Sequence, residues 1–545
     1  MHVMTSLNAI NGVATSADPE LVDGLLRNFS DSWNFTGFVV TDYGGWEGIS
    51  GAAGAFGNHG CTNPNARQDV CCKDNKCAAL KGVQAGLDSD GGGNLALQET
   101  PGLVASGALS SERIAMSFRR LMRQRVRLGM FDPPTANGYN FLAFETVESA
   151  AHVELARLAA QKAICLYQNR APAALGDDDE EDDEEDEAGV ATEVTSERAF
   201  WMASQNSNAT LPLSLSRMLA KPGSVLLAGW TADDGDNLMG NYVEHTDRGG
   251  VNASILAGLA QALGAPMPSP PPPGGDDSAT SPLVWEPGCS DSSCPETDVV
   301  RRVKAHAAAK VADVTILVLG LNHNSKNDDN SNGKGGNGKG GTHENEGSDR
   351  QTIAFPPGQL SLAAELSAKH TGTPLVCVLV HGGSLAPATL MRDCDAIVDL
   401  WYPGDMGGHA LADVLFGRVS PAGRTTQTWY TSDETMPKQG LMTMRPDGDS
   451  PGWTYRYYNK KPAIPFGFGL SFTEFKYSGL TLDAATPADP CAPIGVNVTV
   501  ANVGKMDSDE VVQCYIKQPN ASTGIYTSNP PGACDFCSFS LTDCL

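Results

Sequence analysis

The feature that most constrains the fold is a regular alternation of apolar and helix-forming segments between residues 211 and 435. Short runs rich in valine, leucine and isoleucine recur here, and such continuous apolar runs are typical of strands buried on both faces. The four runs are SVLLAGW (224–230), VTILVLGL (314–321), PLVCVLV (374–380) and AIVDLWYPG (396–404). Helical segments such as RRVKAHAAAKVA and PGQLSLAAELSAKH separate them. The alternation predicts an α/β domain in which helices cover both faces of a mainly parallel sheet.

Residues 1–134 also alternate strand-like and helical segments. The chain opens with a strand-like VMTS, and a second short strand is expected in GFVVTDYGG (37–45). LKGVQAGLDSD predicts a helix followed by a short strand. ALSSERIAMSFRRLMRQRVRLGMF (108–131) predicts a longer helix, with Ser110 or Ser111 as its N-cap and FDPP beyond its end.

Three further regions complete the predicted organisation. Residues 135–210 form a linker, with a helix over ESAAHVELARLAAQKAICLYQN and an acidic low-complexity insertion. Residues 436–470 connect to a last region, 471–545, where VNVTVANVG and DEVVQCYIK alternate apolar and polar residues with a period of two. That period predicts a small β-sandwich. The final NPPGACDFCSFSLTDCL predicts no strand.

The charge of the chain restricts its partners. The net charge is −26, and eleven acidic residues lie in one run, Asp177–Glu187. An acidic surface argues against nucleic acid and anionic membranes as partners. The run fits a solvated, disordered loop better than a cation-binding or protein-binding segment. An apolar stretch of about 18 residues is lacking, so we expect no transmembrane helix.

The fourteen cysteines and six N-x-[ST] sequons favour an oxidising, secretory route. Close pairs such as Cys289 and Cys294 suit local disulfides. The spacing of the first cluster (61, 71, 72 and 77) does not provide the paired C-x2-C ligands of a zinc site, and we expect neither metal nor cofactor. We expect a secreted, cell-wall or vacuolar protein, although MHVMTSLNAINGV lacks the features of a signal peptide.

Asp42 is the first candidate for chemistry, because it follows the apolar run of residues 38–40. A carboxylate at the carboxyl end of a buried strand lies where α/β folds place their active sites. The residues alone leave a second interpretation open, in which Asp42 caps the next helix.

An ordered series of motifs resembles glycoside hydrolase family 3, the exo-acting β-glucosidases and β-xylosidases. VMTSLNAINGV, GFVVTDYGG, AGLDSD and RLGMFDPP resemble the end of the family's barrel. HGGSLAP, WYPGDMGGHALADVLFGRVSPAGR and TYRYYNKKPAIPFGFGLSFTEF resemble its second domain and the exit from it. VANVGKMDSDEVVQCYIK is similar to the fibronectin type III-like domain that follows.

The resemblance implies a mixed α/β architecture over roughly residues 1–520. It implies the C-terminal part of a (β/α)8 barrel (1–134), an α/β sandwich (211–435) and a fibronectin type III-like β-sandwich (471–545). It also implies that the family's earlier barrel strands, which carry most of the sugar-gripping residues, precede this sequence. The interpretation is therefore an N-terminally truncated barrel.

The resemblance also assigns roles to residues. Retaining hydrolysis of a glycoside needs a nucleophilic carboxylate and a second carboxyl group as acid/base. Asp42 matches the nucleophile, and Tyr43 would shape the subsite. Trp46 would offer its ring to a sugar or simply pack in the loop. The acid/base candidates are Glu344 and Glu346 in HENEGSDR (343–350), with Glu344 slightly favoured over Glu346.

The predicted function is that of an exo-acting retaining β-glycosidase that releases terminal β-D-glucosyl or β-D-xylosyl residues from oligo- and polysaccharides. The segment 442–458 favours the xylosidase branch and TDYGG the glucosidase branch, so the sugar stays open. The alternative is a catalytically inactive fragment or a glycan-binding, wall-associated protein, because an incomplete barrel exposes strand edges.

Overall fold

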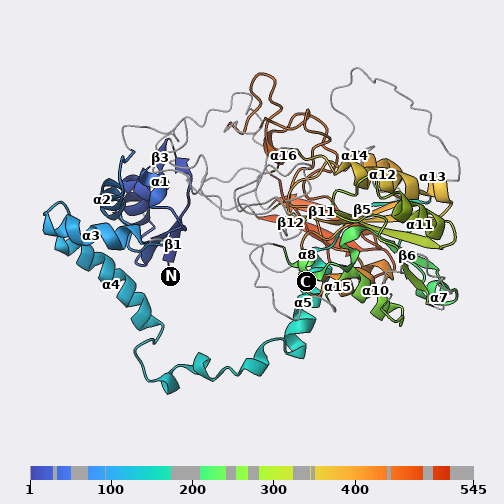
Figure 1. Cartoon of the computed structure of the whole chain (residues 1–545), viewed down its shortest axis with the longest axis horizontal. Helices are drawn as coiled ribbons and strands as arrows, with labels where there is room; N and C mark the ends of the chain where they lie inside the picture. The colour runs from blue at the N-terminus through green and yellow to red at the C-terminus, as the bar shows by residue number, and fades with distance from the viewer. Residues whose placement is uncertain are drawn as a thin grey trace. The chain divides into compact units, whose positions relative to one another are not determined.

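The computed structural model describes most of the chain in two compact units, Met1–Val147 and Glu148–Leu545 (Figure 1). The described residues are 2–10, 12–28, 33–50, 71–92, 94–172, 209–240, 253–267, 281–322, 344, 350, 352–438, 443–482 and 495–515. The acidic run, the glycine-rich stretch 324–341, Glu346 and the C-terminal cysteines lie outside them.

Parallel strand pairing organises the first unit. Strand β1 (His2–Thr5) pairs in parallel with β4 (Phe38–Thr41), and Val40 forms a parallel bridge with Ser89. The strands expected at the chain start and in GFVVTDYGG are thus confirmed. A small antiparallel pair also occurs, β2 (Ala9–Ile10) with β3 (Val13–Ala14).

Helices follow β3 and β4 in this unit. They are η1 (Thr15–Ala17), the π-helix η2 (Glu20–Asn28), α1 (Glu47–Ser50), α2 (Asn75–Ala85), α3 (Leu95–Ala105) and α4 (Ser111–Arg127). The predicted long helix is α4, and its N-cap is Ser110, whose hydroxyl accepts a bond from the N–H of Arg113. Helix α4 ends before Gly129, whose φ of +69° turns the chain out of the helix.

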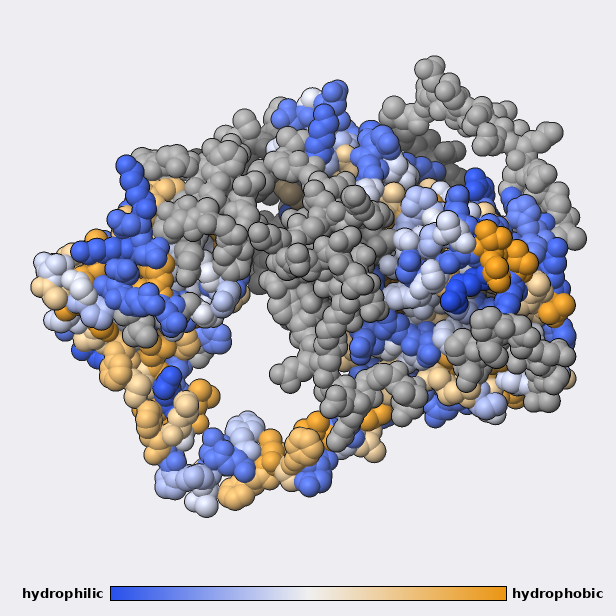
Figure 2. Space-filling view, in the orientation of Figure 1, coloured by the Kyte–Doolittle hydropathy of each residue, from blue (hydrophilic) through white to orange (hydrophobic). Residues whose placement is uncertain are grey.

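The segment after α4 leaves many apolar side chains exposed. Short 3-10 turns occur at η4 (Pro134–Ala136), η5 (Gly138–Phe141) and η6 (Phe144–Thr146). Figure 2 shows apolar surface along the lower part of α4 and these turns, where residues such as Phe131 and Phe144 are largely exposed.

A six-stranded sheet forms the centre of the second unit. Its strands are β5 (Cys165–Asn169), β6 (Val225–Ala228), β7 (Leu283–Trp285), β8 (Val314–Gly320), β9 (Leu375–Val380) and β10 (Ala396–Asp399). The order across the sheet is β5-β10-β9-β8-β6-β7, and every neighbouring pair is parallel except β5 with β10. The strands predicted from all four apolar runs are confirmed.

The helix predicted over residues 148–169 is wrong at its C-terminal end. Helix α5 covers Ala150–Ala163, and the chain then turns at Ile164 into strand β5. The reason is tertiary: the apolar run Cys165–Tyr167 is fully buried as the antiparallel partner of β10. A short apolar run cannot be distinguished from the end of a helix by periodicity alone.

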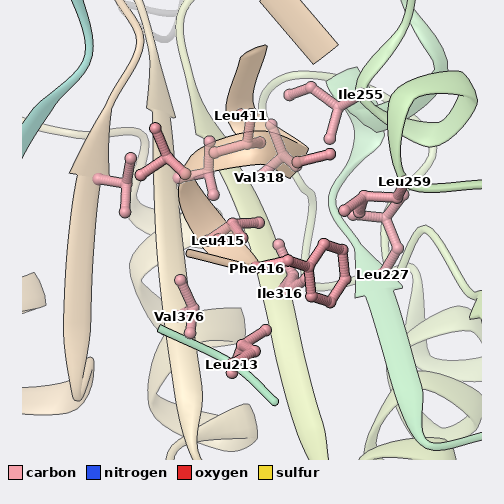
Figure 3. Close-up of a cluster of buried hydrophobic side chains, with 14 of the residues drawn as sticks. Leu213, Leu227, Ile255, Leu259, Ile316, Val318, Val376, Leu411, Leu415 and Phe416 are labelled. Carbon is pink, nitrogen blue, oxygen red and sulfur yellow. The ribbon is translucent and has the colours of Figure 1, made fainter. Parts of the chain in front are cut away.

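Helices cover both faces of the sheet, as predicted for an α/β sandwich. On one face α10 (Ile255–Ala262) and α15 (Gly407–Leu415) pack with α5 against β6, β8 and β9, through side chains such as Leu227, Ile316 and Leu411 (Figure 3). The other face packs against α11 (Val299–Ala309), α12 (Pro357–Leu366) and α14 (Ala388–Asp393). The remaining helices are η8 (Trp230–Asp233), α7 (Leu215–Leu219), α8 (Gly235–Met239), α13 (Ala368–Thr371) and α16 (Thr454–Tyr457).

The C-terminal region differs from its prediction. VNVTVANVG is a strand, β12 (Val496–Asn502), but it pairs with β11 (Phe475–Leu482), which the periodicity did not indicate. Residues 509–515 of the second predicted strand are not a strand. Side chains tie this segment down instead: Asp509 pairs with Lys162, and Glu510 bonds Arg424 and Tyr477.

The local disulfide expected between Cys289 and Cys294 is confirmed, and the structure adds others that the spacing did not indicate. Cys289 is bonded to Cys294, Cys72 to Cys77 and Cys377 to Cys394, and Cys71 is also disulfide-bonded. Three cysteines of the first cluster are therefore oxidised. A helix long and apolar enough to cross a membrane does not occur in the described part of the chain.

Candidate active site

Asp42 lies at the carboxyl end of β4, as the sequence predicted. Its N–H donates to the carbonyl of Thr5 at 3.0 Å, which continues the pairing of β4 with β1. Its Oδ1 accepts a 2.7 Å bond from the N–H of Tyr43. Since α1 begins only at Glu47, Asp42 is too far away to be the N-cap of that helix. The half-buried carboxylate thus stands on the turn that follows a parallel strand.

A buried cluster of charges fixes the strand that carries Asp42. Asp88, with a fully buried side chain, accepts a 3.0 Å bond from the N–H of Val39 in β4. Its oxygens also pair with Arg27 at 2.9 Å, Arg120 at 3.1 Å and Arg113 at 3.6 Å. Burial is the main cause that lowers the pKa of Arg113, against the raising effect of Asp88. This cluster was not predicted, and AGLDSD beside an arginine-rich helix is its only signal in the sequence.

The two aromatic candidates near Asp42 lie in different environments. Tyr43 is 61% exposed, which leaves its ring accessible. Trp46 is 1% exposed and belongs to the core of the first unit, so tightly placed that a Cβ on Gly82 would lie 2.1 Å from its ring. Of the two interpretations of Trp46, the burial favours packing.

In the second unit, the carboxyl ends of three neighbouring strands converge on Glu344. The N–H of Glu344 donates to the carbonyl of Asn322, just after β8, at 3.0 Å. Gly382 and Gly383 follow β9, and Tyr402 follows β10. This edge is where open α/β sheets bind their ligands.

The Glu344 carboxylate accepts bonds from all of these turns. Gly382 N–H and Tyr402 OH donate to Oε1, the latter at 2.7 Å, and Gly383 N–H donates to Oε2 at 2.7 Å. Successive backbone N–H groups of this kind form an anion-binding nest. Burial, followed by the charge of Glu344, raises the pKa of Tyr402, so Tyr402 stays a donor.

A buried ion pair lies beneath the glycine turn. His381 Nε2 lies 3.1 Å from Asp399 Oδ1, and both side chains are fully buried. His381 Nδ1 lies 2.7 Å from the carbonyl oxygen of Gly383, and Tyr167 OH donates to Asp399 Oδ2 at 2.8 Å. Both ring nitrogens thus lie close to oxygen atoms, although the contact of Nε2 with Asp399 is an ion pair without the geometry of a hydrogen bond. Burial lowers the pKa of His381, but Asp399, Glu344 and the Gly383 carbonyl together outweigh it, and the pKa is raised.

Asp399 also supports the turn that carries Tyr402. Its Oδ1 accepts a 3.0 Å bond from the N–H of Trp401, whose φ is +57°. A left-handed backbone at a bulky residue costs on the order of 1 kcal/mol or more, so it persists only where its surroundings hold it. The rings of Trp401 and Trp429 pack against the His381 ring at 5.0 and 5.3 Å between centroids.

Arg350 anchors the other end of HENEGSDR (343–350), the acidic segment that carries Glu344. Its guanidinium donates to the carbonyls of Ser384 and Ala354, each at 2.9 Å. Burial lowers the pKa of Arg350, while Glu344 and Asp433 raise it. Glu346, which comes between Glu344 and Arg350 in the sequence, is outside the described residues. Groups of His, Cys, Asp and Glu suited to a metal ion do not occur within the described residues.

Residues 205–472 match the Glycosyl hydrolase family 3 C-terminal domain. The chain is 28% identical over 481 residues to Beta-D-xylosidase 1 of Arabidopsis thaliana, covering 87% of this chain and 48% of that protein. It is 27% identical over 541 residues to the Periplasmic beta-glucosidase of Salmonella typhimurium, covering 95% of this chain and 58% of that protein. Residues 205–472 of this chain therefore form a glycosyl hydrolase family 3 C-terminal domain.

Solved structures of family 3 enzymes share the fold. A GH3 exo-beta-xylosidase in complex with a xylobiose aziridine activity-based probe matches with a TM-score of 0.67 and 25% identity, over 93% of this chain and 55% of that one. A beta-glucosidase from Erythrobacter marinus matches with a TM-score of 0.62 at 24% identity, over 92% of this chain and 56% of that one, and shows the fold alone. The chain spans about half the length of the relatives it matches.

Proposed function

We propose that this protein is an exo-acting retaining β-glycosidase that removes terminal β-D-glucosyl or β-D-xylosyl residues from oligo- and polysaccharides. The observation that carries the proposal is the pair of carboxylates, Asp42 and Glu344. Each follows the carboxyl end of a parallel strand, in a chain whose relatives are β-xylosidases and β-glucosidases. Retaining hydrolysis needs two such groups.

Asp42 is the proposed nucleophile. Its place on a turn after β4 leaves the carboxylate half exposed, and the buried Asp88 cluster fixes the strand behind it. Attack of an ionised carboxylate on the anomeric carbon forms a covalent glycosyl-enzyme intermediate, which water then hydrolyses. Tyr43, exposed beside Asp42, is proposed to line the subsite.

Glu344 is the proposed acid/base, and Glu346, two residues further on, is the alternative. The acid protonates the leaving oxygen in the first step and then deprotonates the attacking water. Chemical rescue separates the two: azide should restore turnover of an activated substrate only in the variant that lacks the true acid/base. Restoration in Glu346→Ala but not in Glu344→Ala would transfer the role to Glu346.

The finer architecture and setting are part of the proposal. We assign residues 1–134 to the C-terminal part of a (β/α)8 barrel, supported by the parallel pairing of β1 with β4 and of Val40 with Ser89, and by the helices that alternate with these segments. We assign 135–210 to a linker, 211–435 to the α/β sandwich, 436–470 to a connection and 471–545 to a fibronectin type III-like domain. The disulfides support a secreted, cell-wall or vacuolar location, with carbohydrate as the partner, and neither nucleic acid nor membrane.

The stereochemistry of the product tests the proposed function. The full chain is incubated with 4-nitrophenyl β-D-xyloside and β-D-glucoside, and the first-formed sugar anomer is followed by NMR. We expect the β-anomer, and a fluorinated slow substrate should label Asp42. Release of the α-anomer, or a label on another residue, would contradict the mechanism. Absence of turnover on both sugars would favour the glycan-binding alternative.

A further inference from the structure

The turn His381–Ser384 binds the acidic segment at both of its described positions. Gly382 and Gly383 donate their N–H groups to Glu344, and the carbonyl of Ser384 accepts from Arg350. Beneath the turn, His381 contacts the carbonyl of Gly383 through Nδ1. One four-residue turn therefore connects the acidic segment to the buried interior of the sheet.

Asp399 stabilises both turns that hold Glu344. It forms an ion pair with His381, which fixes the turn after β9, and it accepts the N–H of Trp401, which fixes the turn after β10. Tyr402, on this second turn, donates to the same Glu344 oxygen as Gly382. The two turns reach Glu344 from different strands, but both are stabilised by the buried carboxylate of Asp399.

A Cβ on either glycine of the first turn would press against a residue of the site. A Cβ at Gly382 would lie 2.8 Å from the Tyr402 ring, and a Cβ at Gly383 would lie 2.6 Å from Glu344 Oε2. At Gly383 the obstructed atom is the end of a flexible side chain, which can move away at little cost. A methyl group there would displace the carboxylate and leave the sheet intact.

We propose that His381 and Asp399 are positioning residues, which fix the Glu344 carboxylate through the Gly382–Gly383 turn and through Tyr402. Neither residue is accessible to a substrate, since both side chains are fully buried. Their effect on turnover passes entirely through the placement of Glu344. The link to turnover rests on the proposed acid/base role of Glu344, whereas the placement itself does not.

Gly383→Ala in the full chain tests the positioning directly. A misplaced general acid slows substrates with a poor leaving group most, because these depend on protonation. We expect kcat/KM for a phenyl β-glycoside to fall by about 10²-fold, as for a displacement of about 1 Å. The dinitrophenyl glycoside of the same sugar should change little, and so should Tm. Gly102→Ala is the matched control, because a Cβ there meets nothing within 4 Å.

Asp399→Asn tests the buried anion, with Asp413→Asn as its control. Asp413 is also buried and paired, with Arg157 at 2.6 Å, but it lies on α15. We expect both variants to lower Tm and only Asp399→Asn to show the leaving-group-dependent loss. Wild-type values for both substrates in Gly383→Ala, or the same leaving-group signature in Asp413→Asn, would overturn the proposal.

A double-mutant cycle, measured by Tm, tests the placement of Glu344 without any activity assay. If Glu344 and Asp399 are coupled through the turns, the Tm loss of the double variant Glu344→Ala/Asp399→Asn is smaller than the sum of the single losses. Additive losses would overturn the positioning. Coupled losses together with an unaffected Glu344→Gln enzyme would instead remove the acid/base role from Glu344 and leave the positioning in place.

Discussion

The two candidate carboxylates rest on buried aspartates of different kinds. In the first unit, Asp88 binds β4 and is surrounded by Arg27, Arg113 and Arg120. In the second unit, Asp399 supports the turns around Glu344 and pairs with a single cation, His381. Arginine keeps its proton at any ordinary pH, whereas histidine can lose its own. The support beneath Asp42 is therefore permanently charged, and the support beneath Glu344 can be switched off by pH.

The candidate carboxylates also differ in how many hydrogen bonds hold them in place. Glu344 accepts bonds from three donors on two different turns, whereas Asp42 accepts its bond from the adjacent residue of its own turn. A nucleophile must approach the anomeric carbon, so a carboxylate with an open side suits that role. A group that must hold one exact position over a leaving oxygen benefits from a rigid frame.

Removal of Asp42 should give the largest effect on activity. Asp42→Ala deletes the atom proposed to bond the sugar, and loss of a catalytic nucleophile typically costs on the order of 10⁴-fold or more in kcat. The measurement is turnover of nitrophenyl glycosides by the full chain. Tyr139→Phe, at an exposed tyrosine far along the first unit, serves as a control with wild-type turnover. Turnover that persists in Asp42→Ala would contradict the assignment.

Removal of Asp88 should give the largest effect on stability. Asp88→Asn leaves three arginines with too little negative charge in a buried site, and breaking a buried ion pair in this way costs about 3–5 kcal/mol. Urea unfolding, monitored through hydrogen exchange at the amides of α2 and α4, measures the free energy of unfolding of this unit. A loss below about 1 kcal/mol would show that the cluster is not a structural requirement.

The pH dependence of stability distinguishes the two supports. Because Asp399 raises the pKa of His381, the pair stabilises the fold fully below the unfolded value of about 6.5. Its contribution is lost as the pH rises through the higher folded value. Asp399, Glu344, Tyr167 and Cys165 are the titratable groups around this site.

We expect the free energy of unfolding of the second unit to fall as the pH rises above about 6.5, and His381→Gln to remove that slope. Urea titrations across this range provide the measurement. An unchanged slope in the His381 variant would assign the pH dependence to another group.

The smallest effect is expected at an exposed ion pair on α4. Glu112 and Arg119 form a pair whose side chains are 71% and 56% exposed. Glu112→Gln should change the free energy of unfolding by less than about 0.5 kcal/mol, because solvent screens such pairs. A loss as large as that of Asp88→Asn would contradict the importance that we assign to burial.

Much of the fold followed from local pattern. The four apolar runs specified β6, β8, β9 and β10, and the periodic segment around Ser110 specified α4 with its N-cap. The errors arose where partners decided the outcome. The pattern predicts the end of a helix where strand β5 forms, because the partner strand β10 lies more than two hundred residues further along the sequence. Residues 509–515 have strand-like alternation but are held by side-chain bonds to Arg424 and Lys162.

The candidate site also has a part that the sequence determines and a part that only the tertiary structure determines. The sequence by itself determined where the carboxylates fall, because a strand end and an acidic loop are local features, and the order of motifs indicated the family. Only the tertiary structure decided what holds those carboxylates: the arginines around Asp88, and the His381–Asp399 pair beneath the turn that binds Glu344. Charges can be buried only where partners from distant segments meet them, and a linear pattern does not encode those meetings.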